Sequence, residues 1–438
     1  MEILIVGGGY VGMYTARRLE RLLRRGEATV TVVDPRGYMT YQPFLAEAAG
    51  GSIEPRHVIA PLPRVLRRTR VLTGKVVGID HAARLAAFAP ARGPERVLPY
   101  DVLVMAAGSV SRVLPIEGLA EYGVGFKTVG EAIHLRNHVL GQLAAAASAD
   151  DDAIRSAALT LVVVGGGFAG VEALAELQGL ADKAVRFHPA LDPAGLRWVL
   201  VESTGRILPE LDERLGRWAL RTLRRRGVDV RLHTRVVSAA GGTVRLDDGT
   251  ELAAGTLVWA AGVRPSPLAT AAGLPTDGAG RIRVGADLAV TGVPGLFAAG
   301  DIAAVPDLRR PGEFCAPNAQ HAVRQAALLA RNVAAFVRGG QLRPYRHGYA
   351  GSVAGLGHHQ GVAQVYRIRL TGFAGWLAHR VYHLLWVPTL GHKARVLADW
   401  TLALYFGPET AQLASLEHPA DDFRDAFLVG GQGRAARS

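Results

Sequence analysis

The sequence predicts an α/β protein in which one parallel-sheet unit is interrupted by a second unit of the same kind. Three observations predict this fold. The phrase "ILIVGGGYVG" at 3–12 returns as "TLVVVGGGFAG" at 160–170. Each copy opens with a short apolar run, which is typical of a strand buried on both faces of a parallel sheet. Each copy is followed by a stretch with helical periodicity, so the repeated unit is a strand, a glycine turn and a helix.

The glycine spacing G-x-G-x-x-G gives each unit a function. In the first copy, Gly7 permits the sharp turn, Gly9 lets the backbone approach a pyrophosphate, and Gly12 lets helix and strand pack closely. The second copy offers the equivalent residues Gly165, Gly167 and Gly170. The helix that follows each turn suits a diphosphate, because its free N–H groups and its dipole favour negative charge. The sequence therefore predicts two Rossmann-like dinucleotide-binding units.

An acidic residue at the end of the second strand is the other part of this fingerprint, since it can hold a ribose hydroxyl. Asp34 ends the apolar run "TVTVVD", and Glu202 follows the run "LRWVLV". The second gap is longer than the usual spacing of about 20 residues. We attribute the extra length to the connection "ADKAVRFHPALDPAG". The alternative is that each acid only caps a strand.

Composition narrows the class of protein. An apolar content of 49% and a charged content of 20% suit a well-buried enzyme of two or three domains. The formal net charge of +12 indicates an anionic partner, unless it reflects a general composition bias. No zinc-ligand pattern or RNA-binding signature favours nucleic acid. The single cysteine, Cys315, excludes a disulfide framework and a C-x-x-C redox pair within one chain.

Signals for export, membrane crossing and metal binding are not expected. Met1 lies directly before the first predicted strand, which leaves no room for a secretory signal. No apolar run reaches the roughly 18 residues that span a bilayer. The histidine pairs 358/359 and 379/383 are expected to serve packing or headgroup contacts, because no carboxylates accompany them in the sequence.

The repeat also covers the end of each unit. An apolar strand at 101–105 leads to Ala107 and Gly108, and the similar stretch "GTLVWAAG" ends at Gly262. A third strand, "LFAAG", leads to Gly300 and Asp301. We therefore expect a first unit at 1–115 and 285–345, an inserted unit at 116–284, a C-terminal region at 346–407 and a polar tail at 408–438.

These motifs resemble the two-dinucleotide-binding flavoproteins of the pyridine nucleotide-disulfide oxidoreductase superfamily. Within it, the positions of Ala319, Gln320 and Gln325 resemble the A-Q-x-A-x-x-Q helix of type II NADH dehydrogenases. The resemblance implies FAD in the first unit and NADH in the inserted unit. Because the chain lacks a redox cysteine pair, it also implies that electrons pass from the flavin directly to an external acceptor.

The resemblance assigns further residues. Besides the glycines and the two acids above, it implies FAD contacts at Tyr10, Val11, Gln42, Val77, Ala107, Gly108, Gly300, Asp301, Ala319 and Gln320. It implies NADH contacts at Phe168, Glu172 and Gly262. Glu172 and Gln320 are the expected catalytic residues: Glu172 would orient the nicotinamide or relay a proton, and Gln320 would border a quinone pocket. The alternatives are an acid that suits a helix dipole and a polar residue near a helix start.

The C-terminal region predicts two amphipathic helices. One apolar face comprises Trp376, Leu377, Val381, Tyr382, Leu384 and Leu385, and a second comprises Val396, Leu397, Trp400 and Leu404. Residues 341–407 hold seven Lys or Arg against one acid, Asp399, which gives +6. Aromatic, amphipathic and basic segments favour a membrane interface. A cover over the core or a homodimer contact is the alternative, and the family resemblance favours the membrane.

We therefore expect a peripheral flavoenzyme on the cytoplasmic face of the cell membrane. It would oxidise NADH and reduce a membrane quinone, such as menaquinone or ubiquinone, without pumping protons. NADH is expected rather than NADPH because Glu202 would repel a 2′-phosphate. One alternative is a soluble reductase of the same fold that passes electrons to a ferredoxin-like protein. Another is a nucleotide-sensing membrane scaffold without flavin.

Overall fold

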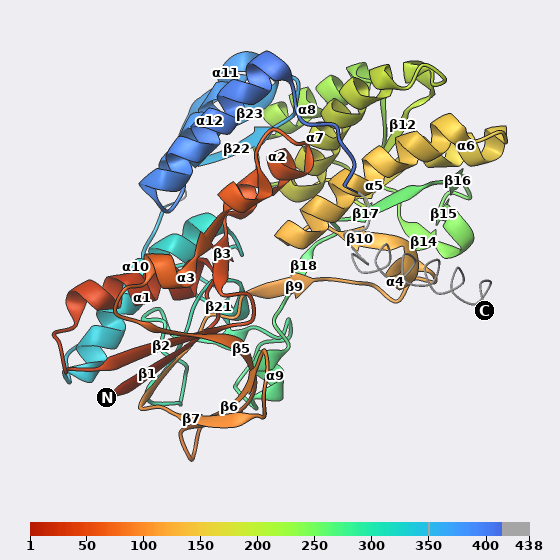
Figure 1. Cartoon of the computed structure of the whole chain (residues 1–438). Helices are drawn as coiled ribbons and strands as arrows, with labels where there is room; N and C mark the ends of the chain where they lie inside the picture. Colours follow the sequence, from red (N-terminus) through yellow and green to blue (C-terminus); the bar gives the residue numbers. More distant parts are fainter. Residues whose placement is uncertain (349–350, 414–438) are drawn as a thin grey trace, which may run out of the picture.

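A computed structural model of the chain describes residues 1–348 and 351–413 (Figure 1). Most of the predicted polar tail, residues 414–438, lies outside the described residues. In Figure 1 the first sheet lies at the bottom, the second at the upper right and the C-terminal helices at the upper left.

The first sheet has seven strands in the order β20-β8-β1-β2-β5-β6-β7. The strands from β20 to β5 are parallel, and β6 and β7 are added as an antiparallel edge. Helices α1 (Tyr10–Leu22) and α10 (Ala319–Val337) pack against each other beside it. The strands are β1 (Glu2–Val6), β2 (Thr29–Asp34), β5 (Arg70–Asp80), β6 (Leu85–Pro90), β7 (Arg96–Pro99), β8 (Val102–Met105) and β20 (Leu296–Ala298). Strand β20 therefore lies in the same sheet as β1, although the second sheet's strands separate the two in sequence.

The second sheet is entirely parallel, in the order β10-β17-β11-β12-β13. Its strands are β10 (Gly123–Gly125), β11 (Thr160–Val164), β12 (Arg197–Val201), β13 (Val228–Arg231) and β17 (Thr256–Trp259). The helices around it are α5 (Val129–Ser148), α6 (Asp152–Ala158), α7 (Phe168–Ala184) and α8 (Glu213–Arg225). The two parallel sheets confirm the predicted α/β class.

Two crossing segments join the units. Strand β9 (Ser109–Ser111) leaves the first unit and β18 (Val263–Pro265) returns to it, and the two pair in antiparallel fashion. The chain therefore enters and leaves the inserted unit at one place, between the two sheets (Figure 1).

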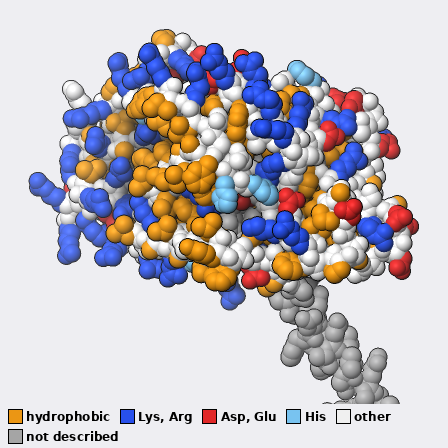
Figure 2. Space-filling view, turned by 90° about the horizontal axis from the view of Figure 1, so that it is seen from above, with side chains coloured by type: hydrophobic (Ala, Val, Ile, Leu, Met, Phe, Trp, Pro, Cys, Tyr) orange, Lys and Arg blue, Asp and Glu red, His pale blue; other side chains and the backbone are white. Residues whose placement is uncertain are grey.

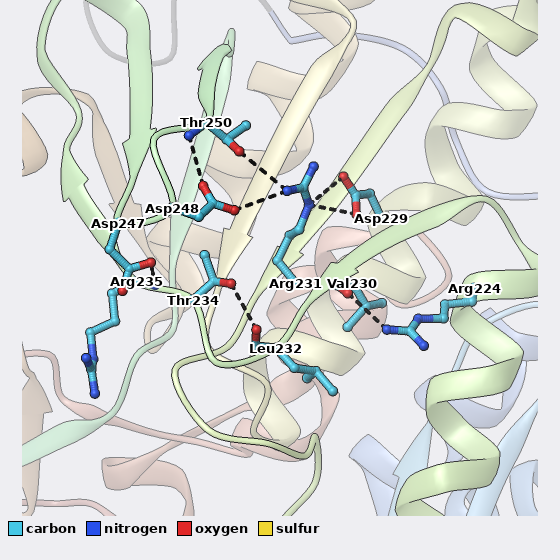
Figure 3. A network of polar contacts seen from close by, with 10 residues as sticks. All are labelled: Arg224, Asp229, Val230, Arg231, Leu232, Thr234, Arg235, Asp247, Asp248 and Thr250. Atoms are coloured by element: carbon cyan, nitrogen blue, oxygen red, sulfur yellow. Dashed lines mark hydrogen bonds and ion pairs between the residues drawn. The ribbon is translucent and has the colours of Figure 1, made fainter.

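A small meander supports the end of strand β13. It consists of β14 (Val236–Ser238), β15 (Thr243–Leu246) and β16 (Glu251–Ala253). Figure 3 shows a polar network between this meander and Arg231 of β13. Arg231 Nε donates to both carboxylate oxygens of Asp229, at 3.0 Å each, and its Nη1 donates to Asp248 at 3.3 Å. The backbone carbonyl of Arg231 accepts from the N–H of Glu202 at 2.8 Å. The network thus fixes the strand end beside Glu202.

The C-terminal region is a three-stranded antiparallel sheet followed by two helices. The strands are β22 (Gly351–Gly355), β23 (Gly361–Val365) and β24 (Ile368–Thr371), and the helices are α11 (Gly372–Trp386) and α12 (Leu390–Phe406). Ala354, Val362, Val396 and Trp400 belong to the same buried core as Leu174 of α7. The C-terminal region is therefore packed into the inserted unit rather than attached loosely to it.

Both helices were predicted, but the grouping of their apolar side chains was wrong. Leu377, Val381 and Leu385 are exposed, whereas Trp376, Tyr382 and Leu384 are partly buried. Likewise Val396 and Trp400 are buried, while Leu397 and Leu404 are exposed. Each helix thus has one apolar face toward the core and another toward the surface, which a single stripe of helical periodicity does not distinguish.

The shorter elements complete the description. They are β3 (Tyr38–Thr40), β4 (Ile59–Pro61), β19 (Ile282–Arg283), β21 (Ala303–Ala304), α2 (Leu45–Ala49), α3 (Leu62–Val65), α4 (Leu119–Tyr122) and α9 (Leu268–Ala271). The 3₁₀ turns are Gln42–Phe44, Pro55–Val58, Val185–Phe187, Pro193–Gly195, Ala240–Gly242 and Gly300–Ile302.

The contact between α11 and β23 depends on a glycine. A Cβ at Gly375 would overlap the carbonyl oxygen of Gly361, whereas a Cβ at Gly391 of α12 would meet no atom within 4 Å. We predict that Gly375→Ala lowers stability by about 1–3 kcal/mol through overpacking. Gly391→Ala, the matched control, should leave stability unchanged or raise it slightly. Thermal melting of the two variants measures this, and equal melting temperatures would contradict it.

Candidate active site

The two glycine turns have the same geometry. Gly7 has φ +104° and Gly165 has φ +114°, a conformation that L side chains rarely adopt. A Cβ on either residue would overlap the backbone at the end of a neighbouring strand, Ala106 in the first unit and Ala260 in the second. The strand, turn and helix predicted for both copies are therefore present, and only glycine fits the turns.

The other glycines of the two motifs are of two kinds: some are in close contact with neighbouring atoms, and others face open space. A Cβ on Gly12 or Gly170 would overlap the carbonyl oxygen of its own glycine turn, so helix and strand could not pack as they do. A Cβ on Gly9 or Gly167 would meet nothing within 4 Å. Open space in front of a helix N-terminus is where a diphosphate would approach, so both cradles fit a dinucleotide.

Each predicted acid is held by its own glycine turn. Asp34 ends β2 and accepts from the N–H of Gly8 at 2.8 Å; Glu202 follows β12 and accepts from the N–H of Gly166 at 2.6 Å. Because a carboxylate has about four acceptor positions, both acids keep capacity for a ribose hydroxyl. Arg206 does not turn toward Glu202: its Nη2 donates to the carbonyl of Leu211 at 2.5 Å.

The remaining residues predicted for FAD lie at several points of the first unit. Ala107 and Gly108 follow β8, and Val77 lies in β5 with 45% of its surface exposed. The N–H of Gly300 donates to the side chain of Gln325 at 2.7 Å. The carboxylate of Asp301 accepts from the hydroxyl of Ser109 at 2.6 Å. In the second unit, Gly262 follows β17.

Ser109 connects this region to a cation that the sequence did not suggest. Lys127 Nζ donates to the Ser109 hydroxyl at 3.0 Å. Burial lowers the pKa of Lys127, while the carboxylates of Asp301 and Glu131 oppose that shift. Ser109 lies in the crossing strand β9 and Lys127 just before α5, so the contact ties the two units together.

A cavity of about 300 Å³ lies where the two units and the C-terminal region meet. Its lining brings together residues from six segments of the chain. The segments are α1, the loop after β3, α7, α10, β22 and α11. The lining residues include Tyr10, Tyr14, Tyr41, Gln42, Phe168, Glu172, Ala319, Gln320, Arg324, Ser352, Tyr382, His383 and Trp386. Both predicted catalytic residues thus line one cavity.

Glu172 and Gln320 are held in defined positions. The Glu172 carboxylate accepts from the N–H of Gly355 at 2.9 Å and lies 3.2 Å from His379 Nε2. The Gln320 amide donates to the carbonyl of Gly351 at 3.2 Å, and its oxygen lies 3.2 Å from His347 Nε2. Both side chains are therefore fixed by contacts with the C-terminal third of the chain.

His379 corrects one expectation. Carboxylates that the sequence did not place near it do accompany it: Glu172 at 3.2 Å and Glu47 at 4.0 Å. Burial disfavours charge on His379, but Glu172, Glu47 and Glu176 outweigh burial and raise its pKa. Among the described residues, no group of His, Cys, Asp and Glu has the arrangement of a metal site. The histidine is a buried side chain flanked by carboxylates that favour its charged form.

Glu47 and His379 were missed as functional residues, although the sequence holds a weak signal for both. Glu47 is the one charged residue in the buried helix α2, and His379 and Arg380 interrupt the apolar pattern of α11. A buried charge within an apolar segment is costly unless it is paired, so a charged residue at such a position indicates a partner elsewhere in the chain. The partner itself is distant in sequence and could not be identified from spacing.

Aromatic hydroxyls complete the lining. Burial, with Tyr14 nearby, raises the pKa of Tyr10, and burial likewise raises the pKa of Tyr41. Both therefore remain protonated donors. The Tyr41 hydroxyl lies 3.2 Å from Nδ1 of His383, whose pKa is lowered by burial and by His379.

Comparison with known proteins identifies the family. The model of the pyridine nucleotide-disulphide oxidoreductases matches residues 1–326. The chain is 31% identical to the type II NADH:quinone oxidoreductase NdhA of Mycobacterium tuberculosis over 430 residues, which cover 94% of this chain and 89% of that protein. It is 30% identical to the Staphylococcus aureus enzyme over 85% of this chain and 91% of that protein.

The chain belongs to the type II NADH:quinone oxidoreductases. The family suggested by the glycine turns and the Ala-Gln helix is thereby confirmed. The fold agrees: the structure of NDH2 from Plasmodium falciparum in complex with NADH has a TM-score of 0.86, with 18% identity, over 94% of this chain and 99% of that one. The contact roles of individual residues remain predictions.

Histidines around the cavity predict acid sensitivity. Burial, with Arg324 next, lowers the pKa of His347 to about 4, and burial also lowers the pKa of His321 and His383. These groups bind protons near pH 6.5 only when the chain is unfolded, so stability should fall as pH drops from about 6.5 toward 4. His379 acts in the opposite direction: its raised pKa adds stability below about 6.5, which is lost as pH rises through its folded pKa.

We predict that the three histidines with lowered pKa values outweigh His379. The melting temperature should therefore fall between pH 7 and pH 5. His347→Gln should make this fall shallower, because one site of proton uptake on unfolding is removed. His188→Gln, at a half-exposed position in the inserted unit, serves as the control. Stability that is constant or rises on acidification would contradict the prediction.

Proposed function

We propose that this protein transfers two electrons from NADH, through a bound FAD, to a membrane quinone. The observation that carries the proposal is the single cavity lined by Glu172 of the inserted unit and by Ala319 and Gln320 of the first unit. A site that two substrates use in turn must border both nucleotide units, and this cavity does. The names of the relatives support the same reaction.

The residues present fit both nucleotides. The cradle at Gly7, Gly9 and Asp34, with Asp301, would hold FAD, and the cradle at Gly165, Gly167 and Glu202 would hold NADH. FAD, when bound, supplies the chemistry that accepts a hydride from NADH and gives two electrons to the quinone. The chain's own contribution is to bind and orient both substrates, to exclude water and to provide protons.

The proton balance assigns a role to Glu172. NADH, one proton and a quinone give NAD⁺ and a quinol, so one proton must enter the site in each turnover. The His379–Glu172 pair would hold a proton at the cavity wall, and the neighbouring carboxylates favour it by raising the pKa of His379. A second cavity of about 220 Å³ is lined by Glu176, Arg380 and Trp400, from the same helices that carry Glu172, His379 and the surface residues of α12.

Helices α11 and α12 would carry the membrane contact. Leu385, Leu404 and Phe406 have 66%, 65% and 84% of their surface exposed, and Lys393 and Arg395 lie between the apolar positions. Figure 2 looks onto this side of the molecule, where hydrophobic side chains gather and Lys and Arg side chains surround them. None of the helices in residues 1–348 and 351–413 has the length and apolar character needed to traverse a bilayer. We propose peripheral docking at the cytoplasmic face of the membrane.

Nucleotide preference tests the inserted unit. We predict that kcat/KM for NADH exceeds that for NADPH at least about tenfold, because Glu202 would repel a 2′-phosphate. Glu202→Gln should narrow the ratio mainly through the KM for NADPH. Steady-state kinetics with a short-chain quinone measure both constants. Equal kcat/KM values for the two nucleotides in the natural protein would refute the assignment of Glu202.

Glu172 is tested by separating the half-reactions. We predict that Glu172→Gln folds and binds flavin normally but slows reoxidation by quinone by about tenfold or more, since proton delivery by a positioned acid contributes about 10²–10⁴-fold. Stopped-flow absorbance follows reduction by NADH and reoxidation by quinone one after the other.

Glu213→Gln is the matched control for Glu172, because Glu213 is an exposed acid in the first turn of α8 and pairs with Arg217. If Glu172→Gln has the same rates as the natural protein in both half-reactions, Glu172 has no catalytic role and serves only as an acid that suits the helix dipole.

Membrane docking is tested by surface substitution, because deletion of 371–438 would remove the lining residues Tyr382 and His383 as well. We predict that Leu404→Ser with Phe406→Ser weakens binding to anionic vesicles by about tenfold or more, since each exposed side chain contributes about 1.5–3 kcal/mol when it enters an apolar phase. Val97→Ser with Ile154→Ser, at exposed apolar positions on β7 and α6, is the control. Unchanged flotation, or a dimer that the first pair of substitutions dissociates, would contradict membrane docking.

A further inference from the structure

Glu47 is a buried charge that neither nucleotide cradle uses. It lies in α2, between Leu45, Ala46, Ala48 and Ala49, and only 3% of its surface is exposed. Removing a carboxylate from water costs several kcal/mol in real proteins unless partners compensate. An acid at this position therefore needs specific partners, and the structure supplies them from the C-terminal helices.

Both oxygens of Glu47 are engaged. Oε2 accepts from the indole Nε1–H of Trp400 at 2.5 Å and lies 3.5 Å from Nη2 of Arg380. The Arg380 guanidinium in turn lies 4.3 Å from the ring centre of Trp376 and 4.6 Å from that of Trp400, so two aromatic rings hold it. The other oxygen, Oε1, lies 4.0 Å from Nδ1 of His379.

His379 is thus placed between two carboxylates, one at each ring nitrogen. Nδ1 faces Glu47, and Nε2 lies 3.2 Å from Oε1 of Glu172 at the cavity wall. A neutral imidazole could donate from only one of these nitrogens, whereas an imidazolium donates from both. At 4.0 Å the contact with Glu47 is an ion-pair distance and not a hydrogen bond, so Glu47 acts on the Nδ1 side of the ring through its charge.

The charges around His379 come from three helices. Glu47 lies on α2, Glu172 and Glu176 lie on α7, and Arg380 and His383 lie on α11 itself. Burial disfavours charge on His379, and the three carboxylates favour it. Removal of one carboxylate therefore shifts this balance in one direction, toward the neutral ring.

We propose that Glu47 is a positioning residue of the quinone half-reaction: it orients the His379 ring toward Glu172 and maintains its charge. This inference deepens the proposed function and rests on it. Glu47 does not line the main cavity, so it acts only through His379. Trp400, which anchors Glu47, is a buried residue of α12, one turn before the exposed Leu404. The position of α12 is thereby coupled, through Trp400, Glu47 and His379, to the position of Glu172.

The test uses the full-length, FAD-loaded protein and the variant Glu47→Gln. Glutamine keeps the size of the side chain and can still accept from Trp400, but it removes the charge. We expect the rate of flavin reduction by NADH to stay within about twofold, because the inserted cradle is untouched. Reoxidation by a short-chain quinone should slow by about tenfold, the effect of about one pKa unit on a group that must be charged.

The pH profile gives a readout that a merely structural role would not move. The quinone half-reaction should lose its rate at a lower pH in Glu47→Gln than in the natural protein, by about one pH unit. Glu47→Asp, which keeps the charge, should restore the natural profile with an intermediate rate. Glu54→Gln, an exposed acid seven residues later, is the control and should change neither half-reaction. Titration of histidine-labelled protein by NMR follows His379 independently of activity and should show its pKa falling in Glu47→Gln.

A second variant tests the proposal independently if Glu47→Gln does not fold. Trp400→Phe keeps an aromatic ring against Arg380 but removes the N–H that anchors Glu47, and it should slow only the quinone half-reaction, by about threefold, which corresponds to a modest loss of one hydrogen bond. Natural quinone rates and pH profiles in both variants would overturn the proposal, and so would equal losses in both half-reactions. A natural protein that NADH reduces but no quinone reoxidises would instead refute the proposed function and leave this contact geometry untouched.

Discussion

The contact between Glu172 and His379 is the interaction on which the arrangement of the site depends. It joins helix α7 of the inserted unit to helix α11 of the C-terminal region at 3.2 Å. The N–H of Gly355, from β22, reaches the same carboxylate at 2.9 Å. A buried ion pair is a weak source of stability by itself, because desolvation offsets the attraction. Its retention here is better explained by what it positions, which is a carboxylate at the wall of a cavity shared by both units.

The duplicated glycine turn explains why that cavity exists. Tyr10 follows Gly9 as Phe168 follows Gly167, and Tyr14 follows Gly12 as Glu172 follows Gly170, each pair at the same spacing. All four of these side chains line the same cavity. The two units therefore present equivalent helix starts to each other. They differ at the second position, where Tyr14 of the first copy corresponds to Glu172 of the second.

Local backbone constraints made the fold predictable. A positive φ at Gly7 and Gly165, and the close approach at Gly12 and Gly170, can be satisfied only by glycine, so the sequence displays them directly. Helices α11 and α12 were predictable for a similar reason, from periodicity and from Pro388. Glu47 and His379 were not, because their partners lie more than 170 residues away and buried pairing leaves no spacing pattern. Which apolar side chains of the C-terminal helices are buried also depended on packing, of α11 against strands β22 to β24 and of α12 against the turn Pro55–Val58.

We propose that the cavity lined by Glu172 and Gln320 receives the quinone. A crystal structure of the FAD-loaded protein with a short-chain quinone can test this. We expect the quinone ring to lie between Tyr10 and Phe168, with one carbonyl oxygen within hydrogen-bond reach, about 2.6–3.2 Å, of Glu172 or Gln320. A quinone bound elsewhere, with both of these side chains unchanged and out of reach, would show that the cavity is not the quinone site.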